Sequence, residues 1–189
     1  VRMLYLDYQA TTPLAPEARD AMLKAGATVT ADLSAQAGRD IVFATLPHDK
    51  ALRGVVLGHT GQPGLASLMS PGSVFVEMST VSPECSAEVA VALAEAGIRY
   101  VRAPVSGSTA TAEQAALTIL ASGDEAGWQA ALPLLKAFST KQFFLGPKEE
   151  ARFMKLVINT LVGANAALLA EALSLGASGG LSRAAMMEV

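Results

Sequence analysis

The sequence predicts an α/β fold in which a parallel sheet carries helices on both faces and is followed by one long helix. From residue 40 to residue 145, short apolar runs alternate with longer helix-like stretches, as in parallel sheets covered by helices. Of the 189 residues, 51% are hydrophobic and only 16% are charged, so the chain can bury a core. The composition changes near residue 147. Residues 151–177 are then almost entirely apolar or small, which predicts one helix buried on most sides.

The expected elements follow from apolar periodicity and from turn residues. Short apolar runs bounded by turn residues predict strands at 3–8, 40–46, 73–78, 99–103, 116–121 and 142–145. Helical spacing predicts helices at 15–24, 49–57, 65–69, 83–96, 124–138, 151–177 and from 181 to the end. The three glycines in residues 58–64 follow a helix instead of a strand, so they do not form a phosphate-binding turn.

Composition argues against several classes of function. The net charge is −3 and the 14 Lys and Arg residues are scattered, so no nucleic-acid partner is expected. Residues 161–176 are interrupted by Asn165 and Glu171 and fall short of about 20 apolar residues, so no membrane partner is expected. His48 and His59 lack companions at ligand spacing, which argues against a zinc site, and no metal is expected. One cysteine, Cys85, cannot form an internal disulfide, which favours a cytoplasmic location.

Lys155 and Asn159 are the first candidate site. Four residues apart on the long predicted helix, they share one face in apolar surroundings. Burial lowers a lysine pKa, which suits a general base near neutral pH. The alternative is a lysine that reaches out to water beside an asparagine bonded to a loop, and spacing alone favours this alternative.

Two further candidates lie where predicted strands end. Ser106, Gly107 and Ser108 offer hydroxyl and backbone N–H groups that suit a carboxylate, although an ordinary turn explains them equally well. The other candidate pairs two stretches at strand ends of the same sheet, where apolar and hydroxyl groups often contact a flat ring or a ribose. These stretches contain Leu46, Pro47, Ser79 and Thr80. Ser and Thr as helix caps are the simpler explanation there.

Residues 25–189 resemble the β-hydroxyacid dehydrogenase family, which includes 3-hydroxyisobutyrate dehydrogenase and tartronate semialdehyde reductase. Family motifs occur in family order and spacing at Ala25-Gly-Ala-Thr-Val29, Asp40-Ile-Val-Phe-Ala-Thr-Leu-Pro47, Met78-Ser-Thr-Val-Ser-Pro83, Ala103-Pro-Val-Ser-Gly107, Leu117-Thr-Ile119 and Lys155-Leu-Val-Ile-Asn159. The resemblance implies an incomplete Rossmann-type sheet and the first long helix of an all-α domain. It also implies NAD or NADP as cofactor, and a small 3-hydroxy acid or semialdehyde as substrate.

The resemblance also implies roles for single residues. Lys155 is the expected catalytic base, and Asn159 is its partner in holding the substrate. The expected substrate carboxylate site is Ser106, Gly107 and Ser108, and the expected cofactor contacts are Leu46, Pro47, Ser79 and Thr80. We further expect a homo-oligomer assembled through the long apolar helix.

The chain departs from the family pattern at several positions. The Gly-x-Gly-x-x-Gly turn that receives the cofactor pyrophosphate is absent. Arg102 stands where the family usually has Asp, and Ser108 where it has Gly. Glu149 and Ala151 replace the family's Gly-x-Gly, and Ile158 replaces an Asn beside the substrate. The helical domain is also expected to stop early. An activity that is impaired, or a non-catalytic remnant, is therefore the alternative to an active enzyme.

The N-terminal segment resembles a different family. Met3-Leu-Tyr-Leu-Asp-Tyr-Gln-Ala-Thr-Thr-Pro13 and the following helix-like stretch are similar to the start of a cysteine desulfurase, without its lysine motif or cysteine loop. A desulfurase-related fragment is therefore a remote alternative. The expected domains are a desulfurase-like segment at 1–24, an incomplete dinucleotide-binding domain at 25–147 and the start of a truncated helical domain at 148–189. We also expect strand 3–8 and helix 15–24 to occupy the place of the family's first strand and helix.

Overall fold

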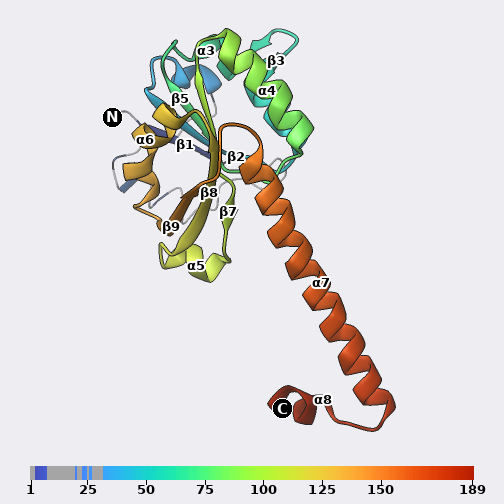
Figure 1. Cartoon of the computed structure of the whole chain (residues 1–189). Helices are drawn as coiled ribbons and strands as arrows, with labels where there is room; N and C mark the ends of the chain where they lie inside the picture. The colour runs from blue at the N-terminus through green and yellow to red at the C-terminus, as the bar shows by residue number, and fades with distance from the viewer. Residues whose placement is uncertain (1–2, 8–19, 21–22, 25, 27–31) are drawn as a thin grey trace. The chain divides into compact units, whose positions relative to one another are not determined.

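The computed structural model describes residues 3–7, 20, 23–24, 26 and 32–189 (Figure 1). The chain divides into two compact units, Val1–Lys155 and Leu156–Val189. The first unit is built around a seven-stranded sheet in the order β1-β2-β5-β6-β8-β7, with β9 paired to β8. Its strands are β1 (Met3–Asp7), β2 (Ile41–Thr45), β5 (Val74–Glu77), β6 (Arg99–Arg102), β7 (Val105–Ser106), β8 (Leu117–Gly123) and β9 (Ser139–Phe144).

The helices confirm most of the predicted periodicity. In the first unit they are the 3₁₀ helix η1 (Leu33–Gln36), α2 (Asp49–Leu57), α3 (Leu65–Leu68), α4 (Pro83–Glu95), α5 (Thr109–Glu113) and α6 (Glu125–Leu135). Between α2 and α3, the predicted loop forms a small hairpin of β3 (Gly58–His59) and β4 (Gln62–Pro63). Helix α7 (Glu150–Ser178) begins in the first unit and continues through the second, where α8 (Arg183–Glu188) follows.

Helices cover both faces of the sheet, as predicted. One core joins β2, β5 and β6 to α2, α3 and α4, and its buried side chains include Phe75, Leu52 and Leu93. The second core lies on the opposite face and joins the same strands to α6 through Val76 and Trp128. Strands that are apolar on both faces fit a sheet buried between two helical layers. The expected Rossmann-like α/β fold is confirmed.

The sheet is mixed instead of purely parallel. Strands β1, β2, β5 and β6 are parallel to one another, whereas β8 is antiparallel to both β6 and β7. A parallel return needs a long crossover connection, usually a helix, but only β7 and the five-residue helix α5 separate β6 from β8. The chain therefore reverses direction there. Strand β9 returns in parallel with β8 after α6.

The N-terminal strand lies at the edge of the sheet. Strand β1 pairs in parallel with β2 along its whole length, from Met3 opposite Ile41 to Asp7 opposite Thr45. This pairing agrees with the hypothesis that the segment occupies the place of the family's first strand. The helix predicted at 15–24 lies mostly outside the described residues.

The long helix is present, but its expected burial is wrong. Within α7, only Ala151 and Arg152 are buried. Its large exposed side chains include Leu161, Val162, Leu168, Leu169 and Leu175. Apolar composition favours burial but does not supply a covering surface, and most of α7 is exposed. By length and composition α7 could also cross a membrane, a test that core helices of soluble proteins pass as well.

Candidate functional site

Two predicted cofactor contacts are joined at the carboxyl ends of neighbouring strands. The backbone N–H of Leu46, after β2, donates a hydrogen bond to Ser79 Oγ, after β5, at 2.5 Å. Both residues are buried, whereas the adjacent Pro47 and Thr80 are exposed. Ligands of open α/β sheets lie beyond this edge. Pro47 and Thr80 therefore face the region where a ligand would lie, and Ser79 holds the two strand ends together.

The serine–glycine turn is tight and is partly engaged in local bonds. Ser106 ends β7 opposite Thr118, and Gly107 follows with a φ of 151°. A side chain on Gly107 would overlap Thr111 Oγ1, so the turn requires glycine. Ser108 caps α5 in a capping box: its Oγ accepts the Thr111 N–H at 3.4 Å, and its own N–H donates to Thr111 Oγ1 at 2.6 Å. The turn therefore leaves Ser106 and Gly107 partly accessible, while Ser108 has a structural bond.

Lys155 lies one turn beyond the buried start of α7. Its side chain is half-buried, and burial lowers the pKa of its amine below the ordinary value of 10.5. Asn159, four residues later, is exposed and belongs to the second unit. A depressed pKa is the property that a lysine needs in order to accept a proton near neutral pH.

A buried polar network at the start of α7 was not predicted from the sequence. Its centre is Arg152, which forms an ion pair with Glu77 at the end of β5. The side chains are 1% and 0% exposed. Arg152 also donates to the backbone oxygen of Ser79 at 2.6 Å, to Tyr100 Oη at 3.1 Å and to Ser86 Oγ at 3.3 Å. One side chain thus connects α7 to β5, β6 and α4.

Charge favours the ionised form of Arg152 despite its burial. Burial alone would lower the pKa of this guanidinium, but neighbouring Tyr100 and Glu77 raise it overall. Burial raises the pKa of Tyr100, so its hydroxyl stays protonated and can donate or accept a hydrogen bond. The Arg152 cation and the Glu77 anion therefore balance each other. The Ser86 hydroxyl links this pair to a second buried cation, Arg102.

Two of the family departures contact each other. Arg102, at the end of β6, forms an ion pair with Glu149, immediately before α7. The guanidinium of Arg102 also lies 4.4 Å from the ring centre of Tyr100, a cation–π contact. A third departure, Ala151, donates its backbone N–H to Ser122 Oγ at 3.2 Å. These three positions fasten the helix start to β6 and β8.

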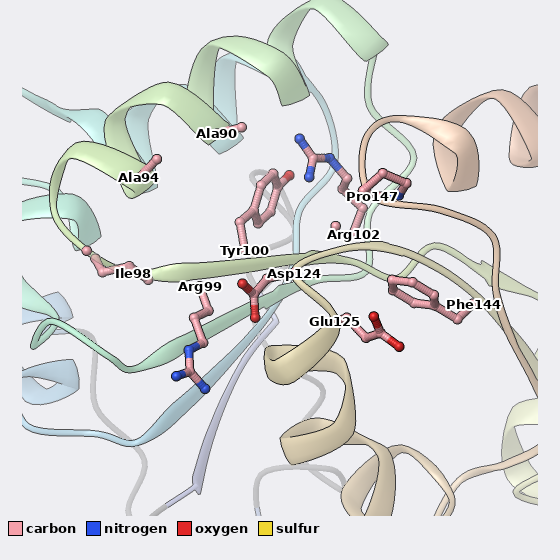
Figure 2. Close-up of a pocket in the computed structure, with 12 residues that line it drawn as sticks. Ala90, Ala94, Ile98, Arg99, Tyr100, Arg102, Asp124, Glu125, Phe144 and Pro147 are labelled. Atoms are coloured by element: carbon pink, nitrogen blue, oxygen red, sulfur yellow. The ribbon is translucent and has the colours of Figure 1, made fainter.

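A separate cavity of about 830 Å³ opens between α4, β6 and the start of α6 (Figure 2). Its lining combines apolar Ile98 and Phe144 with the charged side chains of Arg99, Asp124 and Glu125. None of the site residues predicted from the sequence lines this cavity. Tyr100 and Arg102 also line this cavity (Figure 2), so it touches the buried network.

The fit to a nicotinamide cofactor differs between its two ends. The exposed Pro47 and Thr80 at adjoining strand ends suit a flat ring and a ribose. A pyrophosphate needs closely approaching backbone N–H groups, for which glycine is the usual residue. Residues 1–25 contain no glycine, and residues 8–19 lie outside the described chain. The described edge therefore fits the nicotinamide half of the cofactor.

Comparison with known proteins identifies the domain. The family model described as the NAD binding domain of 6-phosphogluconate dehydrogenase matches residues 8–146. The 2-(hydroxymethyl)glutarate dehydrogenase of Eubacterium barkeri is 39% identical over 153 residues, which are 81% of this chain and 50% of that protein. The NAD-dependent L-serine dehydrogenase of Pseudomonas aeruginosa is 31% identical over 177 residues, 93% of this chain and 58% of that protein.

A solved structure supports the same assignment. The crystal structure of 3-hydroxyisobutyrate dehydrogenase from Salmonella typhimurium superposes with a TM-score of 0.79 at 30% identity. The match covers 93% of this chain and 61% of the other. This chain thus spans between one half and about three fifths of the length of these relatives.

The comparisons give no support to the desulfurase resemblance of residues 1–24. The family model begins at residue 8 and so includes most of that segment in the dehydrogenase-type domain. The chain belongs to the family of the NAD binding domain of 6-phosphogluconate dehydrogenase, and its relatives support the β-hydroxyacid dehydrogenase assignment.

Proposed function

We propose that this chain acts in the NAD(P)-dependent oxidation of a small 3-hydroxy acid such as 3-hydroxyisobutyrate, or in the reverse reduction of the semialdehyde. Accepting the hydride is the chemistry that NAD or NADP supplies when bound. Lys155 Nζ takes the hydroxyl proton as the hydrogen on the same carbon leaves as hydride, and the alcohol becomes a carbonyl. In the reverse direction the ammonium of Lys155 returns that proton to the carbonyl oxygen.

The observation that carries this proposal is the environment of Lys155. Its amine is half-buried with a lowered pKa. Three residues earlier, Arg152 fastens the helix to Glu77 and Ser79 at the carboxyl end of β5, which is the edge where ligands of this fold class lie. Partial burial lowers the energy that this amine needs to become neutral, and a neutral amine is the form that accepts a proton.

The substrate carboxylate is assigned to the serine–glycine turn. Ser106 and Gly107 are partly accessible beyond the end of β6, and Ser108 holds the shape of the turn. In this proposal, Asn159 adds an amide that can hydrogen-bond the substrate hydroxyl. In this proposal the nicotinamide half of the cofactor binds at Leu46, Pro47, Ser79 and Thr80. That position would place the reacting carbon of the substrate between the cofactor and Lys155.

Cofactor affinity is expected to be weaker than in a domain with a glycine motif. Several backbone N–H bonds to an anion contribute several kcal/mol, and each ~1.4 kcal/mol lost weakens binding tenfold. Titration with NADH and with NADPH, followed by nicotinamide fluorescence, tests this directly. Saturable binding of either cofactor and turnover with 3-hydroxyisobutyrate support the proposal. Absence of both, in a folded protein, favours a non-catalytic member of the family.

We also propose that α7 mediates assembly with a second copy of the chain. Exposed leucines recur every seven residues, at Leu161, Leu168 and Leu175, which places them on one side of the helix. We propose in addition that residues 148–189 are the start of a helical domain. Sedimentation should show a dimer or larger assembly, and Leu168→Glu should shift it toward monomer. A monomeric parent protein contradicts this arrangement, and recovery only in the membrane fraction would indicate a lipid environment instead.

The buried, unpaired thiol of Cys85 agrees with a reducing, cytoplasmic setting, which we also propose.

A further inference from the structure

We propose that Arg152 is a positioning residue, whose pairing with Glu77 sets the placement of the Lys155 amine at the carboxyl edge of the sheet. This inference rests on the proposed function, because Lys155 is the expected proton acceptor there. Arg152 itself is buried and does not line the expected substrate region. Its effect on the reaction would therefore pass through the helix backbone.

Arg152 is fixed from several directions at once. It pairs with Glu77 on β5, donates to the backbone oxygen of Ser79 after β5, and donates to the Tyr100 hydroxyl on β6. The planar guanidinium presents its donors in a rigid fork, so these partners define one position and one orientation of the group. A lysine ammonium at this place would keep the positive charge but would lack the planar arrangement of N–H donors.

Helix geometry carries this restraint to Lys155. Residues three apart lie about 4.5 Å apart along the axis and about 60° apart around it, so they neighbour each other on the helix surface. Rotation of the helix about its axis would move both side chains together. Because Arg152 cannot rotate without breaking its contacts, the direction of Lys155 is fixed as well.

Two other contacts prevent the helix start from tilting. The Ala151 N–H donates to Ser122 Oγ on β8, and Glu149 pairs with Arg102 at the end of β6. Three consecutive strands of the sheet, β5, β6 and β8, thus hold the first turn of α7. Lys155 is the last residue of the first unit, so it lies on the part of α7 that these contacts hold.

Stability alone does not explain the Arg152–Glu77 pair. Removing two charges from water costs about as much as the pair regains, and apolar replacements of buried pairs are often neutral or stabilising. What a buried ion pair supplies is a unique geometry. A positioning role therefore fits the pair better than a purely stabilising role.

The test measures the Lys155 amine directly, without substrate or cofactor. Amine-specific labelling over a range of pH, read at Lys155 itself from the fragment ions of its peptide by mass spectrometry, gives the midpoint of its titration and separates it from a lysine introduced at position 152. Exposed Lys136 in the same molecule is the internal reference. The variants are Arg152→Lys, which keeps the charge, and the double variant Glu77→Met with Arg152→Met, which removes both charges. Arg53→Lys, in the exposed Arg53–Glu88 pair, is the matched control.

We expect both test variants to remain folded in thermal unfolding and to move the Lys155 midpoint upward, toward 10.5. We expect kcat to fall about tenfold to a hundredfold, because small misplacements of a reacting group have this effect, with little change in KM for the cofactor. Arg53→Lys should change neither the Lys155 midpoint nor kcat. A folded test variant with an unchanged Lys155 midpoint overturns the inference. Turnover by Lys155→Met tests the proposed function, whereas labelling of Lys155 tests the positioning role of Arg152. The two can therefore fail independently.

Discussion

Arg152 and Glu77 are 75 residues apart in the sequence, yet they form an ion pair in which neither side chain is more than 1% exposed. The carboxylate ends a strand, and the guanidinium begins the helix that carries Lys155. Glu77 also accepts a hydrogen bond from the Ser79 N–H at 2.6 Å, and Ser79 in turn holds Leu46. A single pair thus connects the expected cofactor edge to the start of the expected catalytic helix.

Removing one member of this pair should be strongly destabilising. Glu77→Ala leaves the Arg152 cation buried without its anion, which typically costs about 3–5 kcal/mol. Chemical denaturation of the parent and variant measures this difference in the free energy of unfolding. The control is Glu88→Ala, which breaks the exposed pair with Arg53 and should cost less than about 1 kcal/mol. Equal effects of the two substitutions would contradict the assignment of Glu77 as a buried partner.

Acid sensitivity should arise in part from Asp49. Burial is the largest single influence on its pKa and raises it, but hydrogen bonds from the Ser82 hydroxyl and backbone N–H, together with nearby Arg53, outweigh burial, and the pKa lies below the ordinary 3.8. A depressed carboxyl pKa contributes stability above 3.8 that is lost as the pH falls through the folded-state value. Solvent screening limits the contribution to under about 1 kcal/mol. Asp49→Asn should therefore flatten the pH dependence of the unfolding free energy between about pH 5 and pH 3. A slope identical to that of the parent protein would refute this.

Gly107→Ala should disturb the serine–glycine turn. The added carbon would overlap Thr111 Oγ1 and lie 2.7 Å from Leu117 Cδ2, at a backbone φ that disfavours L side chains. We expect a loss of about 1–3 kcal/mol and a higher KM for the substrate acid. Gly163→Ala, in open space on α7, is the matched control and should be neutral or stabilising by up to about 1 kcal/mol. Unchanged stability and KM in Gly107→Ala would remove the turn from the proposed site.

The Cys85 thiol should be inert in the native protein. It is fully buried, and burial together with the nearby Asp49 carboxylate raises its pKa, so little reactive thiolate exists at neutral pH. Labelling by a thiol reagent should be slower by about a hundredfold or more than in denaturant, because it requires opening of the core. Rapid labelling without loss of structure would show that Cys85 is accessible.

Local sequence signals predicted the individual elements well. Helix α2 has the predicted bounds, since Pro47 ends the preceding strand and Gly58 ends the helix. In contrast, the direction of β8 could not be predicted, because an apolar run has the same pattern in parallel and antiparallel pairing. Exposure of α7 was missed for a similar reason: composition does not reveal what covers a helix.

The site was only partly predictable. Motif order singled out Lys155 and the strand ends, and the structure joins Leu46 to Ser79. The Arg152 network was missed because its partners are distant in sequence. One signal was available, since Glu77 interrupts an apolar strand and a buried carboxylate requires a partner. Nothing local to Glu77 identifies Arg152 as that partner.

The role of Lys155 as proton acceptor is tested most directly by steady-state turnover of Lys155→Met beside the parent chain, at saturating NAD or NADP, with 3-hydroxyisobutyrate. We predict that kcat falls about 10²–10⁴-fold in Lys155→Met. We also predict that the melting temperature stays constant or rises slightly, because a partly desolvated amine has been removed. Turnover by Lys155→Met equal to that of the parent, or no turnover by the parent with either cofactor, would contradict this role.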